Sequence, residues 1–410
     1  MTFCDPLISL FTETSKTMHF ANRLQALEKN VFADMDKAKS QAISNGKTII
    51  DLSLGSSDLA ADPEALNAIA SSLEDHTTHG YLLHYGTLEF RETVAQWYHQ
   101  RFGVEVNPHT EVLTLIGSQE GTAHLPLALL DPGDFALLLD PGYPSHAGGV
   151  YLAGGQIYPM PLLAKNDFLP VFADVPSQVL EQAKMIVLSY PHNPTSATAS
   201  LAFFQEAVAF CQEHGLVLVH DFPYVDIIFE GMAQPPSILQ ADPTKSLSIE
   251  FFTLSKSYNM GGFRIGYAIG NAEIVQALRR VKAVVDFNQY RGILNGAIAA
   301  LTGDQTTVKK TVTRFQSRRD AFINALNNIG WQVASPQATM YVWAKLPQPW
   351  ENKSVEFCTE LVAATGVAVS PGAGFGKQGE GYVRFALVHD PNILELAVEK
   401  IAQFLGRINF

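Results

Sequence analysis

Lys256 is the residue of this sequence with the clearest potential for covalent chemistry. It follows a short apolar segment, Phe251–Leu254, and lies in a polar turn between Ser255 and Ser257. No acidic residue lies close to it along the chain, so we expect its amine to be desolvated at the end of a buried strand. Desolvation favours a neutral amine, which can form a Schiff base with a carbonyl compound. This stretch alone leaves a solvated lysine in a surface loop as an equal alternative.

Two further features could bind an anion. Arg264 is flanked by two apolar residues, so it is a fixed cation in an apolar setting that suits a phosphate. The turn Gly117–Gly121 leads from an apolar segment directly into a predicted helix. The free N–H groups and the dipole at the start of a helix attract anions. Many proteins contain such a turn, so this second signal is weak by itself.

Polar side chains also follow apolar segments that we expect to be buried strands. Asp221, Asn193 and Tyr143 each lie just after such a segment. A carboxylate beside a buried strand needs a partner, although a role as a helix N-cap would also explain Asp221. Tyr143, between two prolines, could stack on a planar ring or simply pack in its loop. Arg384 is alone among apolar residues and also needs a partner, which a structural salt bridge would provide.

The string EFFTLSKSYNMGGFRIGY around Lys256 resembles the lysine signature of the class I/II aminotransferases. These are the fold type I enzymes that use pyridoxal 5'-phosphate (PLP). The resemblance is closest to the alanine and LL-diaminopimelate aminotransferase branch, and it extends from about Phe20 to the C-terminus. The segment Tyr81–Arg91, the pair Asn193-Pro194 and the D-x-x-Y spacing of Asp221 and Tyr224 also match the family's patterns.

The resemblance implies a chemical role for each matching residue. Lys256 would hold PLP as a Schiff base and would then move a proton from the substrate Cα to the cofactor. Asp221 would keep the pyridine nitrogen protonated, and Tyr224 would donate a hydrogen bond to the ring hydroxyl oxygen. Tyr143 would stack on the ring. Asn193 would bind the ring oxygen and also reach the substrate carboxylate.

The resemblance also implies a phosphate site built from both subunits of a homodimer. In this sequence the residues of one subunit would be Ser118, Gln119, Thr253, Ser255 and Arg264, and the neighbouring subunit would supply Tyr85. Close relatives usually carry a lysine at position 119. With Gln119 the phosphate would lose one cation but keep the backbone amides and the other side chains.

For the substrate, the resemblance implies that Arg384 clamps the α-carboxylate and that the backbone N–H of Gly55 faces it. Aspartate-type relatives carry an arginine near position 286, where this sequence has Asp286, with Arg291 as the only nearby cation. LL-Diaminopimelate would suit both groups because its distal end carries an ammonium and a carboxylate. We therefore rank it ahead of alanine and aspartate. His192 could line the substrate channel or be a bystander.

The implied reaction is ping-pong transamination between this amino acid and 2-oxoglutarate, without a metal ion. Two other classes stay open. One is a PLP-dependent lyase that performs β-elimination on the same fold. The other is a non-catalytic protein that uses the fold for binding.

Alternating strands and helices from about 60 to 285 predict an α/β fold with a mostly parallel sheet between helices. The candidate groups fall at the carboxyl ends of strands, where such sheets bind ligands. An α+β small domain and an irregular link over 286–295 should complete the chain. The predicted boundaries are an arm at 1–18, a small domain at 19–55 and 290–410, and a large PLP-binding domain at 56–289.

The overall composition fits this picture. The chain has 410 residues, 47% hydrophobic and 17% charged, which is a globular mix long enough for two domains. A net charge of −12 argues against nucleic acid as the main partner. Three scattered cysteines suggest a reducing compartment, and neither a secretory signal nor a long apolar run is evident. We therefore expect a cytoplasmic enzyme.

Overall fold

The computed structural model describes residues 18, 20–27 and 31–406. The predicted arm at 1–18 lies outside the described residues apart from Met18. In the described part of the chain, no helix is long and apolar enough to cross a membrane.

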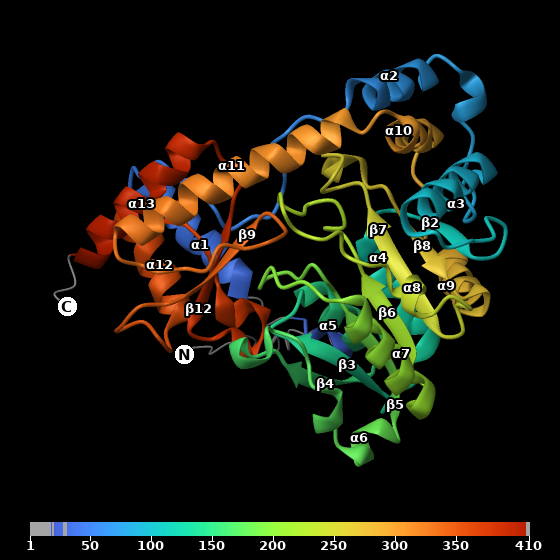
Figure 1. Cartoon of the computed structure of the whole chain (residues 1–410), viewed down its shortest axis with the longest axis horizontal. Helices are drawn as coiled ribbons and strands as arrows, with labels where there is room; N and C mark the ends of the chain where they lie inside the picture. The colour runs from blue at the N-terminus through green and yellow to red at the C-terminus, as the bar shows by residue number, and fades with distance from the viewer. Residues whose placement is uncertain (1–17, 19, 28–30, 407–410) are drawn as a thin grey trace, which may run out of the picture.

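A seven-stranded sheet forms the centre of the molecule (Figure 1). Its neighbouring strands are parallel except where β8 pairs with β2 and β7. The predicted mostly parallel sheet is confirmed. In spatial order the strands are β2 (Val112–Leu115), β8 (Gly266–Gly270), β7 (Ser248–Thr253), β6 (Val217–Asp221), β5 (Ala183–Leu188), β3 (Phe135–Asp140) and β4 (Gln156–Pro161).

Helices cover both faces of this sheet, so its inner strands β7 and β8 are buried along their whole length. Side-chain alternation divides strand β3 between two apolar cores, with Leu137 and Leu139 in one and Ala136 and Leu138 in the other. The first core also contains residues of α2 (Pro63–Ser72), α3 (Leu88–Phe102), α7 (Leu201–His214), α8 (Ile238–Ala241) and α10 (Arg291–Thr302). The second contains residues of α4 (Ser118–Leu129), α5 (Pro144–Ala153) and α9 (Ala272–Val285).

A third apolar core joins the two ends of the chain into a smaller α+β unit. The long helix α11 (Thr306–Asn328) runs between this unit and the large sheet (Figure 1). The strands of the small unit are β1 (Ile50–Asp51), β9 (Tyr341–Lys345), β10 (Val367–Ala368), β11 (Ser370–Pro371) and β12 (Tyr382–Ala386). Its other helices are α1 (Val31–Ser44), α12 (Ser354–Thr365) and α13 (Pro391–Gly406), while the short α6 (Ser177–Leu180) lies before β5 of the large sheet.

Helix α10 corrects the predicted irregular link, because it begins at Arg291. Its sequence contains Gly292 and Gly296, which weaken a helix by themselves. A Cβ on Gly296 would lie 2.5 Å from the side chain of Ile69 in α2, so the glycine permits close packing of the two helices. Tertiary contact therefore stabilises a helix that local propensity does not predict.

Candidate active site

A cavity of about 660 Å³ lies where the large sheet meets the small unit. Its walls come from the carboxyl ends of β5, β6 and β7, from the start of α4, and from β9, β12 and α1. The structure brings together every predicted site residue except Tyr85. These are Gly55, Ser118, Gln119, Tyr143, Asn193, Asp221, Tyr224, Thr253, Ser255, Lys256, Arg264 and Arg384.

Lys256 lies in the turn that follows β7, and it is half-buried. Its Nζ donates a hydrogen bond of 2.5 Å to the carbonyl oxygen of Gly55. It also lies 5.9 Å from the ring centroid of Tyr224. Among the described residues, no carboxylate forms an ion pair with this amine. The amine thus faces the cavity without a charged partner.

Asp221 ends β6 and is 5% exposed. Its Oδ2 lies 3.1 Å from Nε2 of His146, whereas its Oδ1 is buried and has no hydrogen-bond partner in the structure. An N-cap role is excluded because the next α-helix, α8, begins only at Ile238. A buried carboxylate oxygen that lacks a donor fits the protonated ring nitrogen of PLP.

His146 is a site residue that the sequence analysis missed. It lies in the first turn of α5 and is 5% exposed. Its ring meets that of Tyr143 edge-on, with the centroids 5.6 Å apart. The spacing of three residues from Tyr143, at the start of a helix, was the available signal. Burial raises the pKa of Tyr143, so this phenol stays neutral.

The predicted phosphate end of the cavity combines a helix start with hydroxyl groups and a guanidinium. Ser118 begins α4, and Gly117 precedes it with a φ of 77°. A Cβ on Gly117 would lie 2.5 Å from a terminal nitrogen of Arg264, so only glycine allows this approach. The hydroxyl groups of Thr253 and Ser255 lie 2.8 Å apart. Together these groups form a typical anion site.

Arg384 on β12 is buried and has no acidic partner among the described residues, which excludes a structural salt bridge within that part of the chain. Its guanidinium donates a hydrogen bond of 2.8 Å to Oδ1 of Asn193 and one of 2.6 Å to the carbonyl oxygen of Ser53. The rings of Tyr341 and Phe375 hold it, with centroids 4.3 and 4.7 Å from Cζ. A fixed guanidinium with only neutral partners is suited to a carboxylate from solution.

Tyr341 is a second residue that the sequence analysis missed. Its hydroxyl lies 2.8 Å from that of Tyr224. Burial would raise the pKa of Tyr341, but the positive charges of Arg384 and Lys256 outweigh burial and lower it. For Tyr224, burial raises the pKa well above the usual value. A Cβ on Gly55 would overlap the Tyr341 hydroxyl, so the glycine at position 55 allows Tyr341 to approach the backbone there.

Tyr85 lies elsewhere on the surface of the chain. Its ring is partly exposed and packs against Arg279, whose Cζ is 4.2 Å from the centroid, and against Arg91 at 5.3 Å. It does not line the cavity of its own chain. A contribution to the site would therefore have to come from a second subunit.

Asp286 and Arg291 do not line the cavity either. Asp286 accepts a hydrogen bond of 2.8 Å from the buried Lys282, which also donates a hydrogen bond of 2.7 Å to Glu120. The prediction that Asp286 and Arg291 face the distal end of the substrate is therefore wrong for the site formed by one chain. Asp286 instead lies one helical turn after Lys282 and shares that ammonium with Glu120 of α4.

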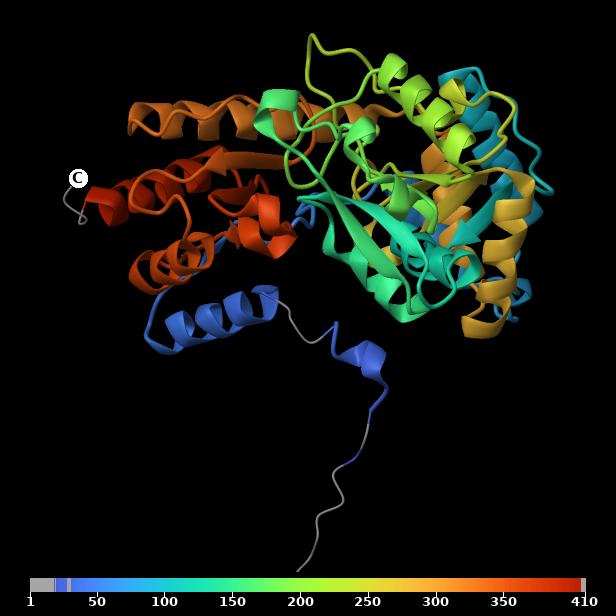
Figure 2. The same ribbon diagram turned by 90° about the horizontal axis from the view of Figure 1, so that it is seen from below.

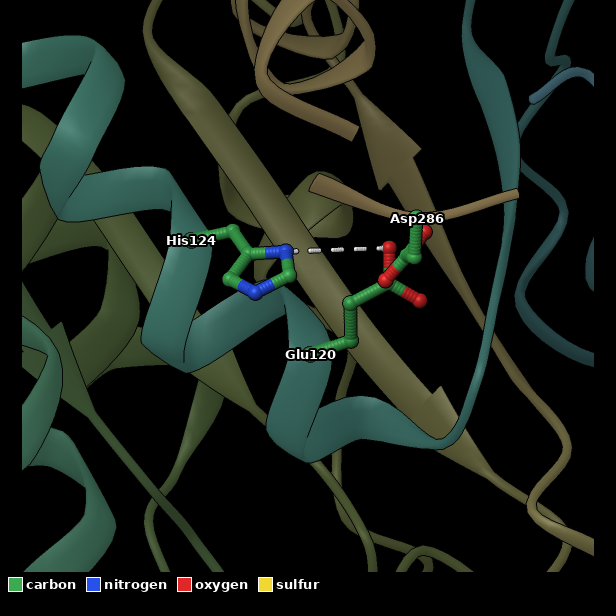
Figure 3. Close-up of side chains that lie close together, drawn as sticks. All are labelled: Glu120, His124 and Asp286. Carbon is green, nitrogen blue, oxygen red and sulfur yellow. Dashed lines mark ion pairs between the residues drawn. The ribbon is translucent and has the colours of Figure 1, made fainter. Parts of the chain in front are cut away.

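Figure 3 shows the side chains of Glu120, His124 and Asp286 pointing toward one another, with His124 Nδ1 3.9 Å from Glu120 Oε1. Their ligand atoms lie within 4.8 Å of one another, a spacing that could hold a metal ion. Glu120 and Asp286 already share the ammonium of Lys282 as an ion-pair partner, however. The cluster is a partly buried ion-pair network at the start of α4.

His192 is fully buried, and its Nδ1 lies 2.8 Å from the hydroxyl of Thr195. Burial, with a smaller contribution from His146, lowers the pKa of His192 to about 3, so the ring is neutral. It does not line the cavity. His192 is therefore a bystander within one chain.

Comparison with known proteins agrees with this geometry. The family model for aminotransferase class I and II matches residues 47–401. The chain is 43% identical over 387 residues to an LL-diaminopimelate aminotransferase of Dehalococcoides mccartyi, covering 94% of this chain and 99% of that protein. It is 39% identical over 393 residues to an LL-diaminopimelate aminotransferase of Moorella thermoacetica, covering 96% of this chain and 100% of that protein.

Solved structures share the fold. A probable N-succinyldiaminopimelate aminotransferase from Thermus thermophilus is 43% identical, with a TM-score of 0.86 over 91% of this chain and 99% of that chain. Substrate-bound BacF from Bacillus subtilis is 33% identical, with a TM-score of 0.90 over 95% of this chain and 98% of that chain. The chain therefore belongs to the class I and II aminotransferases and is a PLP-dependent aminotransferase of fold type I.

Proposed function

We propose that this enzyme transfers an amino group from LL-diaminopimelate to 2-oxoglutarate by a ping-pong mechanism. The observation that carries the proposal is the meeting of three groups in one cavity. They are the amine of Lys256, the unpartnered Oδ1 of Asp221 and the guanidinium of Arg384. The names of the full-length relatives from D. mccartyi and M. thermoacetica support LL-diaminopimelate as the donor.

The cofactor would be held along the length of the cavity. When bound, PLP supplies an electron-withdrawing ring that stabilises negative charge at the substrate Cα. Asp221 would accept a hydrogen bond from the ring nitrogen, and its negative charge would keep that nitrogen protonated. The phosphate would lie at the start of α4, bound by Ser118, Gln119, Thr253, Ser255 and Arg264.

Lys256 would act both as the attachment point for the cofactor and as the proton carrier. Its Nζ contacts the carbonyl oxygen of Gly55, which also lines the cavity. As a free amine it would accept and carry the proton of the substrate Cα. Tyr224 lies beside this amine and stays protonated, so its hydroxyl can donate a hydrogen bond to the ring oxygen of the cofactor.

Arg384 would orient the substrate by its α-carboxylate. Its present partners, Asn193 and the carbonyl of Ser53, fix the guanidinium plane without neutralising its charge. A bidentate pair with the carboxylate would hold Cα near Nζ of Lys256, which lowers the entropic cost of proton transfer.

We also propose that the enzyme is a homodimer in a reducing cytoplasm. The position of Tyr85 outside its own cavity supports a site completed by a second chain. Cys211 and Cys358 are buried and unpaired, which supports a reducing compartment.

The test is a donor screen with the purified PLP enzyme. LL-Diaminopimelate, alanine, aspartate and glutamate are offered with 2-oxoglutarate, and kcat/KM is measured for each. We expect LL-diaminopimelate to be preferred by at least tenfold. A preference for aspartate of that size would contradict the proposed donor.

A second assay tests the reaction class. The enzyme is given LL-diaminopimelate without any 2-oxo acid. A transaminase stops after one equivalent of product per site, because its cofactor keeps the amino group. Continued release of ammonia would instead identify a lyase.

A further inference from the structure

We propose that Asp36 and Lys39 of α1 bind the distal amino acid group of the donor and select a free ammonium group there. This inference rests on the proposed donor, LL-diaminopimelate, which carries an amino acid group at each end. Asp36 would bind the distal ammonium, and Lys39 would bind the distal carboxylate.

The first argument is the set of charges around the cavity. Among the described residues, six charged side chains line it. Four have roles at the cofactor or the α-carboxylate, namely Asp221, Lys256, Arg264 and Arg384. The other two are Asp36 and Lys39, one acidic and one basic. They offer the two charges that the distal end of LL-diaminopimelate needs.

The second argument is the position of this pair relative to Arg384. Lys39 Nζ lies 2.8 Å from Asp36 Oδ1 and 3.1 Å from Asp51 Oδ2. Asp51 accepts hydrogen bonds from the backbone N–H and the hydroxyl of Ser53, whose carbonyl oxygen accepts from Arg384. This continuous chain of contacts fixes Lys39 relative to the clamp for the α-carboxylate.

The third argument is the surface between the two charged ends. Phe32 and Met35 of α1 line the cavity there, together with Leu54 after β1 and with Phe375. The rings of Phe32 and Phe375 meet edge-on, with centroids 5.3 Å apart. Such a surface suits the methylene chain that separates the two ends of LL-diaminopimelate. Figure 2 shows α1 at the edge of the small unit, below the helices of the C-terminal half.

The charge state of the group favours a distal ammonium. Burial would lower the pKa of Lys39, but hydrogen bonds to Asp36 and Asp51 outweigh it and raise the pKa. Burial would raise the pKa of Asp51, but its bonds to Ser53 and Lys39 outweigh it and lower the pKa. By formal charge, the two acidic side chains of Asp36 and Asp51 face the single lysine, which leaves a net negative charge.

This net charge distinguishes two related donors. An N-succinylated diaminopimelate has an amide and an additional carboxylate in place of the distal ammonium. That carboxylate would meet the exposed, negatively charged Asp36 and be repelled. The structure therefore favours the free diamino acid over its N-succinyl derivative.

The experiment compares kcat/KM for LL-diaminopimelate and N-succinyl-LL-diaminopimelate in wild type and variants. Asp36→Asn should lower kcat/KM for LL-diaminopimelate at least tenfold, chiefly by raising KM. The ratio of kcat/KM for LL-diaminopimelate to kcat/KM for the N-succinyl donor should also fall. Lys39→Met should lower kcat/KM for both donors by the same factor, because both carry a distal carboxylate. The ratio of the two kcat/KM values should therefore stay unchanged. Lys39→Arg, which keeps the charge, should restore most of the loss.

Matched controls lie on the same helix. Asp34 and Lys37 form an exposed pair 3.5 Å apart with the same spacing, and they do not line the cavity. In Asp34→Asn and Lys37→Met, kcat/KM for each donor should stay within twofold of the wild-type value. PLP content and the thermal midpoint of each variant identify any change caused by misfolding.

The outcomes separate the two proposals. If wild type uses LL-diaminopimelate but Asp36→Asn changes both donors equally, or neither, the role of Asp36 is overturned and the proposed function stands. If wild type uses neither diaminopimelate donor while it transaminates another amino acid, both proposals fail.

Discussion

Nε2 of His146 lies 3.1 Å from Oδ2 of Asp221, while Oδ1 of the same carboxylate is buried without a partner. The histidine thus engages one oxygen of the carboxylate and leaves the other without a hydrogen-bond partner. An oxygen with no donor in a buried setting is costly unless a ligand supplies one. This asymmetry points to the ring nitrogen of PLP as the missing donor.

Asp221→Asn should therefore bind PLP but lose most of its rate. A neutral amide cannot hold the ring nitrogen protonated, so negative charge at the substrate Cα is less stabilised. We expect kcat to fall by more than tenfold, which corresponds to about 1.4 kcal/mol. PLP content from absorbance and kcat from steady-state assays check this together. A smaller loss would show that Asp221 has only a structural role.

Lys256→Ala should abolish transamination and leave the fold intact. The variant removes the only amine that we assign to cofactor attachment and proton transfer. Circular dichroism and kcat measure the two effects separately. The control is Lys353→Ala, since Lys353 is exposed and pairs only with Glu356 among the described residues. Turnover of Lys256→Ala within tenfold of wild type would refute the assignment.

Tyr85→Phe should weaken PLP binding in a dimeric enzyme. We expect its hydroxyl to reach the phosphate of the neighbouring subunit, so the loss of one hydrogen bond should raise the Kd for PLP severalfold. Tyr81→Phe is the matched control because Tyr81 lies in the same segment and is strongly exposed. Light scattering measures the oligomeric state. A monomer, or a PLP-bound crystal structure with Tyr85 more than one water from any phosphate, would contradict this prediction.

Asp58→Asn should destabilise the protein at neutral pH and less so in acid. The buried Arg318 donates two hydrogen bonds of 2.7 Å to the Asp58 carboxylate. Burial would raise the pKa of Asp58, but these bonds outweigh it and lower the pKa below that of the unfolded chain. The stabilisation is thus complete above the unfolded pKa, near 4, and is lost as the pH falls through the lower folded value.

We expect a loss of about 1–3 kcal/mol in the free energy of unfolding at pH 7, because Asp58 is partly exposed and Asp390 still contacts Arg318. Urea unfolding of wild type and variant at several pH values measures the difference. Asp320→Asn is the control and should change stability little, because the Asp320 side chain in its ion pair with Arg319 is half exposed. A difference that stays constant or grows below pH 4 would disprove the linkage.

The sequence by itself determined most of the cavity, because the relevant side chains lie at the ends of apolar segments. Asp221, Lys256 and Asn193 each follow a buried strand of the large sheet, and the carboxyl ends of parallel strands lie along one edge. Alternation and periodicity are local properties, so they can be found without knowing which strands are neighbours. The family resemblance then supplied the chemistry that these groups perform.

The tertiary structure alone decided which charges remain available for the substrate. The sequence suggested Asp286 as the partner of a distal ammonium, but Asp286 lies outside the cavity and shares Lys282 with Glu120 of the distant α4. His146 joins the site because α5 packs its first turn against Asp221. Asp36 and Lys39 reach the cavity because α1 packs in the small unit at the cavity wall, although it is far from the catalytic lysine in sequence. Contacts between distant segments depend on the packing of whole elements, and no local pattern in the chain encodes them.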